Sequence, residues 1–145
     1  LGLPDARRKD RETKKKAQEY LERVNLLPYK DAIAGSLPYG IQRKLEIARA
    51  IATKPKLLLL DEPAAGMNNE ETLELIDFIR NIHSDNETNM AIILIEHHLE
   101  VVMNLCSDIT VLNLGSVLKK GTPAEIQSDP AVIKAYIGER RKSDG

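Results

Sequence analysis

The feature that most constrains the fold is a run of four leucines, Leu57 to Leu60, followed at once by Asp61-Glu62-Pro63. Short apolar runs without polar alternation are typical of strands that are covered on both faces, and such strands occur mainly in parallel sheets flanked by helices. Prolines at positions 55 and 63 limit the strand to a few residues. The run therefore predicts a strand at residues 56–60, buried on both faces, in an α/β protein.

Strands and helices alternate along the chain. Met90–Ile95 is a second apolar run of strand length, and apolar residues at helical spacing predict helices around both strands. The helices are expected at about residues 17–26, 41–53, 69–82 and 97–106, with two short ones after residue 121, the second near 130–137.

The C-terminal part begins with a predicted β-hairpin. Residues 108–114 and 117–120 are the expected strands, and Gly115-Ser116 is the expected turn. The whole pattern predicts an α/β fold with a mostly parallel sheet, flanking helices and this hairpin. It also predicts a helical part at residues 1–53 and a sheet-containing part at residues 54–145.

Composition excludes several classes of protein. The formal net charge is −1, and no apolar run approaches the roughly 20 residues that span a bilayer, so we expect a soluble cytoplasmic protein that binds no nucleic acid. A single cysteine, Cys106, excludes an internal disulfide framework. Residues 1–30 carry nine basic and five acidic side chains. This excess fits either a patch facing an anionic membrane surface or a solvated helix face.

Two adjacent carboxylates, Asp61 and Glu62, end the leucine strand. The carboxyl ends of parallel strands are where open α/β sheets bind ligands. Asp61 would hold the Mg²⁺ of a nucleotide there, directly or through water, and Glu62 would orient or deprotonate an attacking water. An Asp-Glu-Pro tripeptide is also compatible with a plain polar loop after a strand, so the pair alone does not decide the function.

Four segments, in this order, resemble the ABC ATPase family. LPYGIQRKLEIARAI at 37–51 resembles the signature loop and its helix, and LLLLDEP at 57–63 resembles the Walker B strand. Residues 65–68 resemble the D-loop, and Ile95-Glu96-His97 resembles the strand end that precedes the switch histidine. The resemblance implies part of a P-loop NTPase fold that uses ATP and Mg²⁺ as a dimer.

The resemblance implies a role for each matching residue. Glu62 and His97 would be catalytic, with a neutral His97 imidazole on the γ-phosphate, and Asp61 would hold Mg²⁺. Asn68 would lie in the D-loop at the dimer interface. The signature loop would offer a helix N-terminus to the ATP of the partner subunit. Its residues are Leu37, Pro38, Tyr39, Gly40 and Ile41.

The sequence departs from the family pattern at several of these positions. Pro38 stands in place of serine, Tyr39 in place of glycine, and Ile41 in place of glutamine. Asn68 replaces the usual aspartate, and His98 also stands where aspartate is frequent. We interpret these differences as variation within the family rather than loss of the site.

The tail narrows the resemblance. GTPAEI at 121–126 and DPAVIKAYIGE at 129–139 resemble the ATPase subunits of branched-chain amino acid importers. This implies a second ATPase subunit, membrane-embedded permease subunits, and a place on the inner face of the cell membrane. An ABC-type ATPase outside transport and a non-catalytic interaction fragment stay open as alternatives, and the sequence does not specify the solute.

No P-loop is evident in the sequence. The one G-x-x-x-x-G spacing, Gly35 to Gly40, lacks the following lysine. In the ABC ATPase family the P-loop lies N-terminal to the segments matched by this chain. We therefore expect a C-terminal half, without tight ATP binding or turnover alone, that self-associates through uncovered sheet edges and apolar patches.

Overall fold

The structure is a computed structural model that describes residues 4–84 and 89–135. The chain forms two compact units, residues 1–95 and 96–145, and each is described by itself. The division expected from the sequence, at residues 53 and 54, stays a prediction. The elements are α1 (Pro4–Arg23), η1 (Leu27–Tyr29), η2 (Ala34–Ser36), α2 (Tyr39–Ile51), β1 (Leu57–Asp61), α3 (Asn69–Ser84), β2 (Ala91–Ile95), α4 (Leu99–Leu105), β3 (Ile109–Asn113), β4 (Ser116–Gly121) and α5 (Pro123–Ser128).

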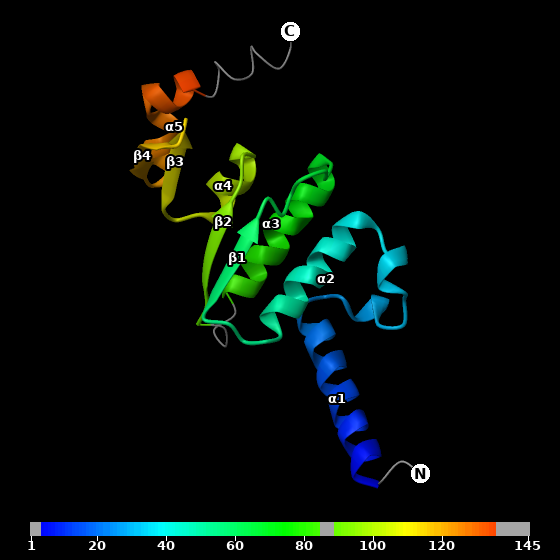
Figure 1. Ribbon diagram of the computed structural model, residues 1–145. Helices are drawn as coiled ribbons and strands as arrows, with labels where there is room; N and C mark the ends of the chain where they lie inside the picture. Colours follow the sequence, from blue (N-terminus) through cyan, green and yellow to red (C-terminus); the bar gives the residue numbers. More distant parts are fainter. Residues whose placement is uncertain (1–3, 85–88, 136–145) are drawn as a thin grey trace. The chain divides into compact units, whose positions relative to one another are not determined.

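A parallel pair of strands forms the sheet of the first unit. β1 and β2 run side by side in Figure 1, with Leu57 opposite Ala91 and Asp61 opposite Ile95. Their connection contains α3, as a parallel crossover requires. The alternating order of strands and helices therefore gives the α/β fold that the sequence predicts.

Helix α3 carries much of the core of this unit. Helical spacing predicts a buried stripe of Leu75, Phe78, Ile79 and Ile82, and these residues are buried, together with Thr72 and Ile76. α2 packs on α3, and Gly40, Ile47, Ala48 and Ile51 are its buried residues. Helical spacing predicts Leu45, Ala48, Ile51 and Ala52 on the buried face of this helix, which is partly wrong, since Ala52 is exposed and Leu45 only half-buried. The helix begins at Tyr39. The face that it buries is the one that packs on α3, and the periodicity of a single helix does not specify where its neighbour lies.

The expectation that β1 is buried on both faces is wrong for this structure. Leu58 and Leu60 are buried, whereas Leu57 is 47% and Leu59 66% exposed. The same face of β2 carries Ile93 and Ile95, exposed by 52% and 60%. The described residues cover one face of the strand pair, so the other remains an apolar surface.

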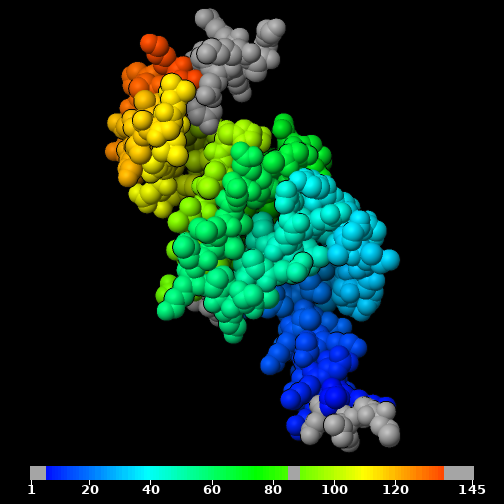
Figure 2. Space-filling view, viewed as in Figure 1, coloured from blue at the N-terminus to red at the C-terminus, as the bar shows by residue number. Residues whose placement is uncertain are grey.

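Helix α1 is solvated over most of its length. Most side chains of α1, which is blue in Figure 2, are exposed. Ion pairs along the helix join Arg8 to Glu12, Lys14 to Asp10 and Lys15 to Glu19. This fits the solvated-face interpretation of the basic N-terminal region. None of the described helices combines the length and the apolar character needed to cross a membrane.

A Schellman motif ends α1. Asn25 takes a φ of 57°, the Asn25 N–H donates to the Glu22 carbonyl at 3.0 Å, and the Leu26 N–H donates to the Leu21 carbonyl at 2.7 Å. This pair of bonds satisfies the last carbonyls of the helix. Leu26, at 2% exposure, is thereby turned into the core.

The second unit is built around the predicted hairpin. β3 and β4 pair antiparallel as a sheet of their own. The turn is Leu114-Gly115, with φ of 48° and 77°, so the expected Gly115-Ser116 turn is displaced by one residue. Asn113 pairs with Ser116, which leaves a two-residue loop with positive φ at both positions, as type I′ turns require. A small core of Ile109, Ile126 and Val132 packs against this hairpin, α4 and the C-terminal helices.

The helix that follows α5 is helical over residues 130–135. Its expected extension to residue 137 lies outside the described residues, as does most of the polar segment 84–89, for which the sequence predicts a loop.

Candidate functional site

Asp61 and Glu62 lie together at the carboxyl end of the strand pair. Asp61 is the last residue of β1, opposite Ile95 of β2, and both carboxylate residues are exposed. The Glu62 N–H donates to the Ile95 carbonyl at 2.8 Å, so β2 fixes the backbone on which Glu62 is carried. The structure therefore brings together the expected metal ligand and the expected base.

The backbone at Glu62 is strained. Its φ of 43° is in the left-handed region, which costs a residue with a Cβ roughly 1–2 kcal/mol. The next two residues, Pro63 and Ala64, are buried, and the Ala65 N–H donates to the Glu62 carbonyl at 3.1 Å. These contacts hold a sharp turn. The turn ends the strand and keeps Glu62 at the solvent-facing edge of the sheet. Strained non-glycine residues of this kind cluster at functional sites.

Glu96, His97 and His98 form a polar cluster at the start of the second unit. The Glu96 side chain is 0% exposed, and its Oε2 accepts the backbone N–H groups of His97 at 3.0 Å and His98 at 3.2 Å. The Nδ1 of His98 lies 3.1 Å from the same oxygen. The His97 side chain is 63% exposed, and its ring centroid lies 4.3 Å from that of His98.

The buried Glu96 carboxylate holds the backbone that leads into α4. Each of Glu96, His97 and His98 offers one possible metal-ligand atom, and these three atoms lie within 4.8 Å of one another, a spacing that a metal ion could bridge. Oε2 of Glu96 already accepts two backbone hydrogen bonds, so the observed contacts show this carboxylate holding the backbone of His97 and His98 in place rather than binding a metal ion. Sequence reasoning missed Glu96, and its one signal was an acid between an apolar strand and two histidines. Since His97 belongs to the second unit, its geometry relative to Asp61 and Glu62 stays a prediction.

The expected signature loop leads into the first turn of α2. Leu37 is buried, Pro38 is the N-cap without a side-chain cap bond, and Tyr39 begins the helix. The Gln42 side-chain amide donates to the Leu37 carbonyl at 2.7 Å and braces the loop from inside the helix. Gly40 is buried where an added Cβ would lie 3.4 Å from Glu71 Oε1, so the helix start packs closely on α3. A helix N-terminus exposes backbone N–H groups and the positive end of the helix dipole.

Asn68 caps α3. Its side-chain oxygen accepts the Glu71 N–H at 2.9 Å, and the Glu71 carboxylate accepts the Asn68 N–H at 3.1 Å. This is the reciprocal arrangement of a capping box. Asparagine is a favoured N-cap, so the sequence alone allows the cap at Asn68 or Asn69, and the structure assigns it to Asn68. The further D-loop role of Asn68 stays a prediction.

Tyr39 makes a contact that the sequence did not reveal. Its hydroxyl donates to the Ala65 carbonyl at 3.0 Å and accepts a bond from the Arg43 Nε at 3.1 Å. Arg43 also lies over the Tyr39 ring and pairs with Glu46 at 2.8 Å. Hydrogen bonds to Glu46 and then to Tyr39 raise the pKa of Arg43.

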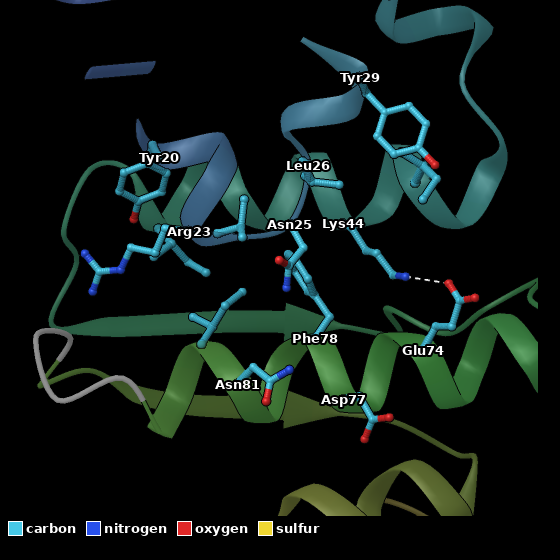
Figure 3. Close-up of a pocket in the computed structure, with 14 residues that line it drawn as sticks. Tyr20, Arg23, Asn25, Leu26, Tyr29, Lys44, Glu74, Asp77, Phe78 and Asn81 are labelled. Carbon is cyan, nitrogen blue, oxygen red and sulfur yellow. Dashed lines mark hydrogen bonds and ion pairs between the residues drawn. The ribbon is translucent and has the colours of Figure 1, made fainter. Parts of the chain in front are cut away.

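A hollow in the first unit lies away from the two carboxylates. It has a volume of about 380 Å³ and lies between the end of α1, α2 and α3. At one end the Lys44 ammonium pairs with Glu74 at 2.6 Å (Figure 3). Of the expected site residues, Ile41 lines this hollow, whereas Asp61 and Glu62 do not. The hollow is therefore distinct from the candidate catalytic edge.

Comparison with known proteins agrees with this arrangement. A family model described as ABC transporter matches residues 3–65, and one described as branched-chain amino acid ATP-binding cassette transporter matches residues 120–142. A solved structure of MJ1267, an ATP-binding cassette of an ABC transporter in its ADP conformation, superposes with a TM-score of 0.74 at 30% identity, covering 86% of this chain and 49% of that chain. The fold and the ordered motifs thus correspond to part of an ATP-binding cassette.

The chain belongs to the family of ABC transporter ATP-binding proteins. It is 46% identical to the high-affinity branched-chain amino acid transport ATP-binding protein BraF of Pseudomonas aeruginosa, over 94% of this chain and 52% of BraF. It is 45% identical to LivG of Escherichia coli strain K12, described in the same words, over 96% of this chain and 54% of LivG. The chain spans about half the length of these relatives.

Proposed function

We propose that this chain is part of the ATP-hydrolysing subunit of an ABC importer for branched-chain amino acids. The observation that carries the proposal is the Asp61–Glu62 pair at the carboxyl end of β1, with Glu62 held in a strained conformation by β2. Relatives at 45–46% identity, named as branched-chain amino acid transport proteins, support the choice of solute class.

The residues present fit the chemistry of a bound nucleotide and its metal. Mg²⁺ is commonly held by one or two carboxylates together with phosphate oxygens, and Asp61 supplies an exposed carboxylate at the strand end. When bound, the ion neutralises charge that develops on the phosphates. Glu62, the adjacent exposed carboxylate, orients a water molecule and accepts its proton. His97 donates a hydrogen bond to the terminal phosphate group in this proposal.

The start of α2 serves a nucleotide held by a second subunit in the proposed dimer. Residues 37–41 present a helix N-terminus, whose free N–H groups and dipole favour an anion. Asn68 lies in the segment that faces the same interface. The protein acts at the inner face of the cell membrane with permease subunits, and ATP is hydrolysed only when two such subunits close on it.

Replacement of the base tests the proposal. In the complete subunit, Glu62→Gln should lower the ATP hydrolysis rate by at least about a hundredfold, because general base catalysis contributes 10²–10⁴-fold. ATP-bound dimers should persist in this variant and be visible by gel filtration. Glu70→Gln, the same change at an exposed residue in the first turn of α3, should hydrolyse ATP like the wild type. An undiminished rate in Glu62→Gln would overturn the assignment.

The 145-residue chain alone gives a second test. Because its sequence contains no G-x-x-x-x-G-K-[ST], it should bind ATP–Mg²⁺ only weakly in a calorimetric titration and should not turn it over. Tight binding by this chain would show that it holds phosphate in another way.

A further inference from the structure

The turn after Glu62 is fastened to the start of α2 by one side chain. The Tyr39 hydroxyl donates to the Ala65 carbonyl at 3.0 Å, between residues 26 positions apart in the sequence. The ring also lies against Gly66, whose added Cβ would meet the Tyr39 ring at 3.8 Å. The contact therefore joins the first residue of a helix to a turn that carries a candidate catalytic residue.

The tyrosine is itself held in place from the helix. Arg43 Nε donates to the Tyr39 hydroxyl at 3.1 Å, its guanidinium lies 5.4 Å from the centre of the ring, and Glu46 pairs with it at 2.8 Å. The hydroxyl thus accepts one hydrogen bond and donates another, so both roles of the group are used. A glycine at this position, the residue usual in the family, would leave Arg43 and the Ala65 carbonyl without this link.

The turn is short and internally bonded. The Ala65 N–H donates to the Glu62 carbonyl at 3.1 Å, and the Met67 N–H donates to the Ala64 carbonyl at 3.1 Å. Gly66 takes a φ of 77°, which glycine adopts without strain. The Ala65 carbonyl that Tyr39 holds lies between these two bonds, so its position sets the path of the chain from Glu62 to the cap of α3.

We propose that Tyr39 is a positioning residue that makes the start of α2 and the turn at residues 62–67 move as one body. The effect of this link on activity rests on the proposed function, in which both segments of one subunit face the nucleotide and the partner subunit. A single hydroxyl then couples the presentation of the α2 N-terminus to the placement of Glu62. Closure of the dimer requires the two segments together, so loosening one from the other weakens closure and turnover rather than ATP binding by a single subunit.

The experiment uses the complete subunit with Tyr39→Phe, which removes the hydroxyl and keeps the ring. Tyr29→Phe is the matched control, since Tyr29 lies on η1 away from the turn. Hydrogen exchange of the amides of Ala65 and Met67 reports on the turn without any need for activity. Tyr39→Phe should speed their exchange about three- to tenfold, the range for losing one net hydrogen bond, while Tyr29→Phe should leave it unchanged.

Dimerisation and kinetics report on the consequence. In the Glu62→Gln background, Tyr39→Phe should weaken ATP-dependent dimerisation about three- to tenfold. In the otherwise native protein it should lower kcat by a similar factor while KM for ATP stays within about twofold. A midpoint of thermal unfolding close to that of the wild type separates this outcome from general destabilisation.

Three results would count against the proposal or its basis. Unchanged exchange of Ala65 and Met67 in Tyr39→Phe would show that the hydroxyl does not hold the turn. Faster exchange with unchanged dimerisation and kcat would reduce Tyr39 to a local structural role and overturn the coupling. If the Glu62→Gln subunit formed no ATP-dependent dimers, the proposed function would fail, and the exchange result would still decide whether Tyr39 holds the turn.

Discussion

At the scale of single residues, Asn68 shows how a departure from the family pattern is absorbed. The amide oxygen of Asn68 accepts the Glu71 N–H, and an aspartate carboxylate at the same place would accept it equally. Asparagine and aspartate are similarly good N-caps. The loss of a negative charge at this position therefore leaves the helix start intact, because the backbone bond and not the charge is what α3 requires.

This argument predicts the effect of removing the cap. Asn68→Ala should lower the free energy of unfolding by about 1 kcal/mol, since the Glu71 N–H loses its partner. Asn68→Asp should be neutral or slightly stabilising, because a negative charge near a helix N-terminus is favourable. Urea unfolding followed by circular dichroism measures both. Asn69→Ala, next to the cap in the sequence, should change stability little; an equal loss at both positions would contradict the assignment of the cap.

At the scale of elements, the hairpin turn contains a residue that its conformation does not favour. Leu114 has a φ of 48° and is 98% exposed, so it combines left-handed strain with an apolar side chain in water. Asparagine visits this region readily, and Asn-Gly is the preferred pair for a type I′ turn.

Leu114→Asn should therefore raise the free energy of unfolding of the second unit by about 1 kcal/mol. Gly115→Ala should lower it by a similar amount, because the φ of 77° at Gly115 is strained for alanine. Chemical denaturation of the two variants gives the opposite signs directly. A destabilising effect of Leu114→Asn would mean that the turn is not of this type in solution.

The cap of α5 makes the stability of the second unit depend on pH. The Glu125 carboxylate accepts bonds from the Thr122 backbone N–H at 2.8 Å and from the Thr122 hydroxyl at 3.0 Å, and in that order they lower the pKa of Glu125. Lys119 lowers it further. Glu125 binds a proton less readily in the folded state than in the unfolded state. Its contribution to the stability of the folded state is therefore fully present above the unfolded pKa of about 4.3. It is lost as the pH falls through the lower folded value.

Urea midpoints measured between about pH 6 and pH 3 should fall on acidification, and Glu125→Gln should flatten that fall. Glutamine can still accept from Thr122, so the capping geometry is kept while the titration is removed. Glu100→Gln, at an exposed residue in the first turn of α4, serves as the control. A pH dependence that is the same in Glu125→Gln and in Glu100→Gln would contradict the assignment to Glu125.

The elements differ in how well the sequence predicted them. The buried stripe of α3 was confirmed because helical periodicity is a local property of the chain. The two-sided burial of β1 was wrong because burial of a strand depends on the layers around it, which its own residues do not fix. Asp61 and Glu62 were predicted from their place after a strand, whereas the Tyr39–Ala65 bond was missed because it spans 26 positions and needs the tertiary fold. The turn at Leu114 was missed since leucine gives no signal for positive φ.

At the scale of the whole molecule, the uncovered face of the strand pair is the dominant surface feature to explain. Leu57 and Leu59 of β1 lie on the same face as Ile93 and Ile95 of β2, and all four side chains are about half or more exposed. The chain spans about half the length of its relatives, and parallel sheets are as a rule covered by helices on both faces. A contiguous apolar face of this kind marks an interaction surface or an aggregation liability.

The 145-residue chain should therefore self-associate through this face. Its weight-average mass, measured by light scattering after gel filtration, should rise with concentration above that of a monomer. Leu59→Lys should shift the association toward monomer by at least about tenfold in dissociation constant, because it places a charge at the centre of the apolar face. Ile33→Lys makes the same kind of change at a residue that is 78% exposed outside the strand pair, and it should leave the association unchanged. Equal effects of the two variants would show that net charge, and not this face, controls assembly. A strictly monomeric chain at all concentrations would show that the face is covered in solution in a way that the described residues do not reveal.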